Sequence, residues 1–174
     1  MTIGLPQDGD IGENNNNLNK IMNLLEVIPR GETPICKQIN QIAIKIKAME
    51  QELINNDDIA LIIIISDGQS TDGDIVTALK QLVGLPVQIN VRACTDESTT
   101  IEYWHEVNAK VDINFLVLDD IECEATQIDE MNSWMTYGES LHRAREFGVV
   151  LPSMDNIDYC QLSIDDIKTI VQML

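Results

Sequence analysis

The stretch IALIIIISDGQSTDGD, residues 59–74, opens with an apolar run of mostly β-branched residues and changes abruptly to small polar residues at Ser66. An apolar run without polar alternation is typical of a strand buried on both faces, as in the middle of a parallel sheet. Gly68 allows the backbone to turn directly after the strand. Ligands bind at the carboxyl ends of strands in open α/β sheets. Asp67, at the tip of this strand, is therefore the first candidate for a functional residue.

Strand and helix patterns alternate along the rest of the chain. Apolar residues recur every three or four positions over 35–53, which predicts a helix with one apolar face. Thr33 and Pro34 pair a favoured N-cap residue with proline at the first helical position. Two later apolar strands are followed by polar tips at Asp96 and Asp119. We predict helices at 33–54, 72–83, 99–108 and 121–131, and strands at 59–65, 87–93 and 113–118.

This order of elements predicts an α/β fold, a three-layer Rossmann-like architecture with a mostly parallel sheet flanked by helices. Right-handed crossovers make the strands parallel, so the acidic tips at Asp67, Asp96 and Asp119 are expected on one edge of the sheet. Asp72 and Asp74, which follow Asp67, are interpreted as turn and helix-start residues, because negative charge there complements a helix dipole.

Three segments are expected along the chain. Residues 1–17, which include an asparagine tract, are predicted to be loop or disorder. Residues 18–131 are expected to form the α/β domain. It begins with apolar residues at helical spacing over 18–28. Residues 132–174 are expected to be a helical extension packed on the same domain, with helices at 139–147 and after Ser163. Ser163 and Asp166 resemble a capping box at the start of the last helix.

Composition limits the classes of partner. The 174 residues carry 29 acidic and 11 basic side chains, a formal charge of −18. This balance argues against nucleic acid and against anionic membranes, both of which need clustered Lys and Arg. It suits a basic partner or divalent cations, although an acidic surface that only keeps the protein soluble is the simpler and favoured interpretation.

The cysteines and the N-terminal sequence bear on localisation. Four cysteines are widely spaced without a CxxC pair, which favours free thiols in a reducing compartment. The first residues lack the pattern of a signal peptide, and no apolar run is long enough to span a membrane. We therefore expect a cytoplasmic or nuclear protein.

The residues GETPI at 31–35 and SDG at 66–68, followed by QSTDGD, resemble the middle of a von Willebrand factor A domain. The resemblance covers roughly residues 18–118. It implies a doubly wound α/β sheet that binds Mg²⁺ or Mn²⁺ at a metal-ion-dependent adhesion site on its carboxyl edge. The family's ligand threonine corresponds to Thr33 and its Asp-Gly aspartate to Asp67. The resemblance also implies a protein partner that supplies an acidic residue to the metal.

One family feature is missing from the sequence. The family's Asp-x-Ser-x-Ser loop, which follows its first strand, occurs nowhere in the chain. We therefore expect an N-terminally incomplete or divergent domain. Each candidate ligand has an alternative interpretation that involves no metal. Thr33 would be a helix N-cap, and Asp67 would close its loop through backbone hydrogen bonds.

Three functions compete at this point. The first is a non-catalytic protein-interaction module whose metal ligands are Thr33 and Asp67, with a partner-binding edge at Ser66, Gly68, Asp96 and Asp119. The second is a Mg²⁺-dependent hydrolase or phosphotransfer domain that uses the aspartates at the strand tips. It lacks a P-loop and a lysine at those tips. The third is a structural remnant without a working site.

Overall fold

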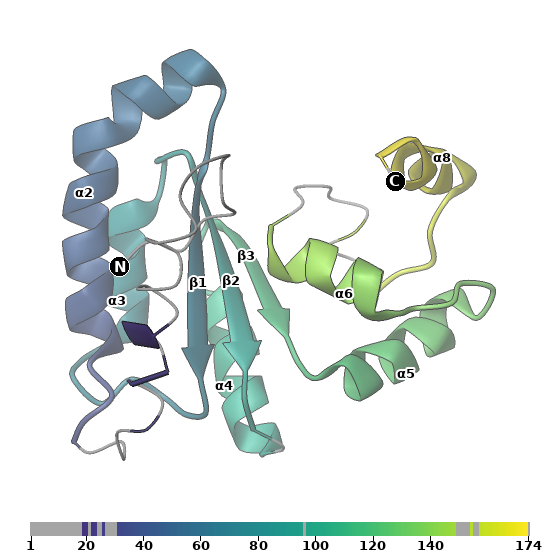
Figure 1. Ribbon diagram of the computed structural model, residues 1–174, viewed down its shortest axis with the longest axis horizontal. Coiled ribbons are helices and arrows are strands. Elements are labelled where there is room, and N and C mark those ends of the chain that lie inside the picture. The colour runs from purple at the N-terminus through teal and green to yellow at the C-terminus, as the bar shows by residue number, and fades with distance from the viewer. Residues whose placement is uncertain are drawn as a thin grey trace. The chain divides into compact units, whose positions relative to one another are not determined.

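The computed structural model describes residues 19–20, 22–23, 26, 31–95, 97–148, 154 and 157–173 (Figure 1). Contacts divide the chain into two units, residues 1–32 and 33–174. In the first unit, residues 19–20 and 22–23 are helical. Three predictions lie outside the described residues. They concern residues 1–17, most of the helix over 18–28, and the strand tip at Asp96. The elements that follow all belong to the second unit.

Three parallel strands form the sheet. They are β1 (Ala60–Ser66), β2 (Val87–Ala93) and β3 (Asn114–Leu118), in the order β1-β2-β3. Ile62 lies opposite Ile89, and Ile89 lies opposite Phe115, so the carboxyl ends of the strands meet at one edge. The predicted α/β fold with a parallel sheet flanked by helices is confirmed.

Three helices cover one face of this sheet. They are α2 (Ile35–Asn56), α3 (Ile75–Leu79) and α4 (Ser98–Asn108), and α3 continues as a 3₁₀ turn, η1 (Lys80–Leu82). Their apolar faces and the inward residues of the strands form one core, which is aliphatic apart from Trp104 and Phe115. Burial of this surface supplies the main driving force for folding.

The opposite face of the sheet carries the C-terminal part of the chain. This part contains α5 (Ile121–Asn132), α6 (Glu139–Glu146) and α8 (Ile164–Met173). The buried amide of Asn90 in β2 donates to the backbone carbonyls of Arg145 (2.9 Å) and Glu146 (3.0 Å) at the end of α6. Figure 1 shows α2 and α3 on one side of the strands and α6 on the other. The second unit therefore has three layers.

Strand β1 differs from the prediction. It pairs with β2 alone among the described strands, so it lies at an edge of the described sheet. Ile62 and Ile64 are buried, but Ile63 is 38% exposed and Ile65 is 71% exposed. The turn after α6 lies against the start of β1, since a Cβ on Gly148 would lie 2.8 Å from the Leu61 side chain. The expectation that this strand is buried on both faces is wrong for the part of the chain that the structure describes.

The other predicted elements lie within a few residues of their expected bounds. The capping box of α8 is confirmed, because the Ser163 amide donates to the Asp166 carboxylate (3.0 Å) and the Asp166 amide donates to the Ser163 hydroxyl (3.2 Å). Cys36 is buried, Cys94 and Cys123 are exposed, and none of these three forms a disulfide. Among the described helices, none has the length and apolar character needed to cross a membrane.

A buried ionic cluster joins the C-terminal helices to the sheet. The Arg145 guanidinium on α6 contacts the Glu124 carboxylate on α5 and lies 3.2 Å from the Asp158 carboxylate. All three side chains are almost completely buried. The second carboxylate oxygen of Glu124 accepts a hydrogen bond from the Asp119 amide, just after β3 (3.0 Å). Burial raises the pKa of Asp158, and the attraction of Arg145 does not offset this effect.

Replacement of Arg145 by Met should strongly destabilise the protein, because it leaves the carboxylates of Glu124 and Asp158 buried without a cation. We expect the free energy of unfolding to fall by about 3–5 kcal/mol. Urea denaturation followed by circular dichroism measures this loss. Arg143→Met is the matched control on the same helix, because the Arg143 side chain is 54% exposed. Equal losses in the two variants would contradict a structural role for the buried cluster.

Candidate functional site

The loop after β1, residues 66–74, is closed by its own hydrogen bonds. The hydroxyl of the buried Ser66 accepts from the Gly68 amide (3.2 Å) and donates to the Gly68 carbonyl (3.0 Å). The Ser66 carbonyl accepts from the Cys94 amide, just after β2 (2.9 Å). Ser66 therefore shapes the turn that presents Asp67, and its own side chain is engaged within that turn.

The same loop is fastened to the residues that precede α2. The Thr71 amide donates to the Thr33 carbonyl (3.1 Å), and the Thr33 amide donates to the Thr71 hydroxyl (2.8 Å). These two bonds run between segments that are far apart in the sequence. They bring Thr33 to the loop that carries Asp67, as the sequence-based hypothesis requires.

Asp72 also connects the loop to α2 through hydrogen bonds. Its carboxylate accepts from the backbone amides of Cys36 (3.0 Å) and Lys37 (2.8 Å) in the first turn of α2. The Ser70 hydroxyl also donates to it (2.8 Å). Desolvation raises the pKa of Asp72, but these hydrogen bonds together outweigh it and hold the pKa below its usual value. Asp72 therefore caps a helix that lies before it in the chain.

Asp74 caps the helix that follows it. Its carboxylate accepts from the amides of Val76 and Thr77, both at 3.2 Å, at the start of α3. The hydrogen bond from the Thr77 hydroxyl is the largest effect that lowers the pKa of Asp74. The interpretation of Asp74 as a helix-start residue is confirmed. The role of Asp72 as a cap for α2 was not predicted, because the sequence around α2 contains no sign of it.

The two predicted metal ligands differ from these capping residues. Asp67 is exposed and makes no hydrogen bond or ion pair to the described part of the chain. Thr33 is half-buried, and its bonds involve its backbone groups only. The alternative role of Thr33 as an N-cap is wrong, because Pro34 occupies that position and Asp72 binds the free amides of α2. The loop-closing role proposed for Asp67 is likewise not seen among the described residues.

A polar hollow lies beside this loop. It has a volume of about 290 Å³ and separates the loop from α4. Ser70, Gly73 and Asp74 line one side, and Tyr103 and Lys110 line the other. The Lys110 ammonium lies 3.1 Å from the carboxylate of Glu106, one helical turn earlier. A partner side chain could therefore enter next to the loop and meet polar groups.

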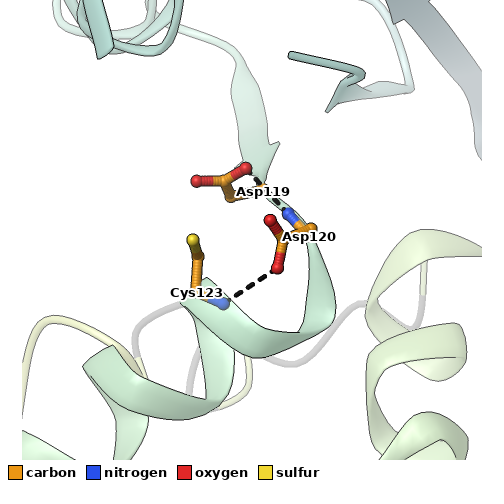
Figure 2. A group of neighbouring side chains, drawn as sticks. All are labelled: Asp119, Asp120 and Cys123. Atoms are coloured by element: carbon orange, nitrogen blue, oxygen red, sulfur yellow. Dashed lines mark hydrogen bonds between the residues drawn. The ribbon is translucent and has the colours of Figure 1, made fainter. Parts of the chain in front are cut away.

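A second group of potential ligand atoms lies where β3 leads into α5. Figure 2 shows Asp119, Asp120 and Cys123, whose ligand atoms all lie within 4.8 Å of one another. Asp119 accepts from the Asp120 amide (2.8 Å), and Asp120 accepts from the amides of Glu122 (2.8 Å) and Cys123 (2.9 Å). Asp119 was predicted as part of the partner-binding edge, whereas Asp120 and Cys123 were not singled out.

This second group is chemically a helix cap. The hydrogen bond from the Cys123 amide is the largest effect on Asp120 and lowers its pKa. Desolvation and the charges of Asp119 and Asp120 raise the pKa of the Cys123 thiol to about 11. A protonated thiol is a poor metal ligand, and Mg²⁺ and Mn²⁺ prefer oxygen. The thiol of this group therefore suits a hard cation poorly, and only its two carboxylates are oxygen donors.

Comparison of the chain with protein-family models, curated proteins and solved structures found no match. The resemblance to von Willebrand factor A domains stays a prediction from the residues at 31–35 and 66–74. The candidate site accordingly rests on the loop between β1 and α3, which carries Asp67 and is hydrogen-bonded to Thr33 through Thr71.

Replacement of Asp72 by Ala should destabilise the protein, because the carboxylate accepts two hydrogen bonds from the first turn of α2 and a third from Ser70 within the loop. Since the pKa of Asp72 is lowered in the folded state, its contribution is present above the unfolded value of about 3.9 and is lost as the pH falls through the folded value. The urea midpoint of the variant should therefore lie below that of the wild type at neutral pH, and the difference should shrink in acid.

Asp58→Ala is the control for this prediction, because Asp58 is an exposed aspartate at the other end of β1. Its midpoint should match that of the wild type. A difference between Asp72→Ala and wild type that persists unchanged in acid would contradict the charge-dependent cap.

Proposed function

We propose that the chain is a non-catalytic protein-interaction module of the von Willebrand factor A type, with its binding face at the carboxyl edge of the sheet. The observation that carries this proposal is the contrast among the aspartates of one loop. Asp72 and Asp74 are both engaged as helix caps, whereas Asp67 is exposed and unpaired among the described residues. The loop thus holds one carboxylate free at the tip of β1.

The rigidity of the loop supports a binding role. Its start is closed at Ser66, its middle is bonded to Thr33, and its end caps α3 through Asp74. A group held by a fixed backbone loses little conformational entropy when a partner binds. The same bonds would hold a catalytic residue equally well, but the hydroxyl of Ser70 donates to a carboxylate, that of Asp72, which is already engaged in capping α2.

We further propose that Asp67 and the Thr33 hydroxyl bind Mg²⁺ or Mn²⁺. Both are hard oxygen donors, and both lack a described partner that would compete with a cation. Two protein ligands leave most of the coordination sphere to water, as is common for Mg²⁺. One of these positions would accept an acidic residue of the protein partner. A bound cation would attract that acidic residue, which the formal charge of −18 on the protein would otherwise repel.

The other residues of this edge would support the contact. Gly68 follows Asp67 without a side chain that would block access, and Asp119 is half-buried at the tip of β3. We place the protein in the cytoplasm or nucleus, because its cysteines are widely spaced and include no CxxC pair, a pattern that favours a reducing compartment.

A calorimetric titration with Mn²⁺ tests the proposed site. We expect weak binding by the free protein, with a dissociation constant of about 0.1–1 mM, because the protein supplies few ligands. Asp67→Ala should abolish the heat of binding, and Thr33→Val should reduce the affinity several-fold. Asp58→Ala, which removes an equal charge at the other end of the strand, should bind like the wild type.

Two outcomes would contradict the proposal. One is unchanged Mn²⁺ binding by Asp67→Ala, which would place the cation elsewhere. The other is loss of binding in Asp120→Ala with retention in Asp67→Ala, which would assign the cation to the group at the start of α5.

A further inference from the structure

An apolar hollow lies in the C-terminal part of the chain, between the start of α6 and helix α8. Its volume is about 360 Å³, within the size range of ligand sites in proteins. The floor includes Ile170, which is buried in a small core with residues of α5 and the segment before α8. The apolar side chains that line the hollow are Trp134, Met135, Leu141, Ile167, Ile170 and Val171.

The rim of the hollow exposes large apolar surfaces. Trp134 is 54% exposed and Val171 is 66% exposed. Contiguous apolar surface of this kind marks interaction sites on soluble proteins. Trp134 is notable because tryptophan is enriched among the residues that dominate binding at protein interfaces. Folding of the described part of the chain leaves this surface uncovered.

An acidic side chain lines the hollow, and helix α8 beside it carries more acidic than basic residues. Among the described residues that line the hollow, only Glu139 is charged. Arg143 lies 3.6 Å from Glu139 and also pairs with Glu146, which Arg92 contacts at 3.4 Å, so these four side chains are neutral together. On α8, Lys168 pairs with Asp165 (2.9 Å), and Asp166 remains as an additional negative charge. A positively charged partner is therefore favoured.

A second copy of this chain does not fit these charges. Each copy carries a formal charge of −18, so association would bring two strongly acidic surfaces together. Contacts between like charges oppose binding and suppress wrong partners. The occupant must supply apolar side chains for the hollow and positive charge for its rim.

We propose that this hollow is a docking site for a cationic amphipathic helix of another protein. The apolar face of that helix would fill the space between Trp134, Leu141 and Val171. Its lysine or arginine side chains would lie near Glu139. This is the common helix-in-groove mode of recognition. The site is separate from the carboxyl edge of the sheet and needs neither Asp67 nor a divalent cation.

The test uses a synthetic amphipathic helix with leucines on one face and lysines on the other. A reference peptide keeps the leucines and replaces each lysine by glutamate. Binding is measured by fluorescence anisotropy of labelled peptide, in EDTA so that no divalent cation contributes. The lysine peptide should bind and should weaken with added salt, whereas the glutamate peptide should not bind.

Two pairs of variants locate the binding. Val171→Asp should lower the affinity for the lysine peptide by about tenfold or more, because it places a charge in the apolar hollow. Ile164→Asp is the matched control, because Ile164 lies on the same helix, is 73% exposed and is outside the hollow. Glu139→Gln should weaken binding by about two- to fivefold and reduce its salt dependence, whereas the exposed Glu130→Gln on α5 should not.

Three results would overturn the proposal. The first is equal affinity of Val171→Asp and Ile164→Asp, which would reduce the binding to general attraction between a basic peptide and an acidic protein. The second is equal binding of the two peptides. The third is a dimer in sedimentation that Val171→Asp dissociates, which would make a second copy the occupant. Asp67→Ala should bind the lysine peptide like the wild type. A negative result for the docking site can therefore be distinguished from a negative result for the metal site.

Discussion

The contact on which the site depends is the one between the Asp72 carboxylate and the first free amides of α2. A helix begins with amides that have no partner within the helix, and here a distant loop supplies the acceptor. This bond fixes the position of the loop after β1 relative to α2. It also frees Thr33 from capping. A single carboxylate therefore determines both the shape of the loop and the availability of the hydroxyl beside it.

A second constraint connects the sheet to the C-terminal helices. Arg145 contacts Glu124, and Glu124 binds the backbone at the tip of β3. The carboxyl edge of the sheet and the apolar hollow beside α8 thus belong to elements that share one buried ionic cluster. The two proposed binding sites differ in chemistry, since one would take an acidic residue through a cation and the other a basic helix.

Much of the fold could be predicted from the sequence, because the spacing of apolar residues and the residues that end helices and strands are local signals. Strand β2 has its predicted bounds, and the helices follow their apolar periodicity. The exposure of Ile63 and Ile65 in β1 could not be predicted, because an unbroken apolar run does not show whether another element covers each face of the strand. The cap formed by Asp72 was missed because it joins residues distant in sequence. Asp67 could be selected from its place at the tip of an apolar strand, whereas Thr33 could be selected as a ligand only by resemblance to a family.

The central claim is that a cation binds at the tip of β1 between Asp67 and Thr33. Paramagnetic broadening of amide resonances by substoichiometric Mn²⁺ tests it most directly, because the effect is strongest for the nuclei closest to the ion. We predict that the amide signals of Thr33, Asp67 and Gly68 broaden first, while those of Asp120 and Cys123 remain sharp. Broadening that begins at Asp120 and Cys123, or that leaves Gly68 unaffected, would contradict the account.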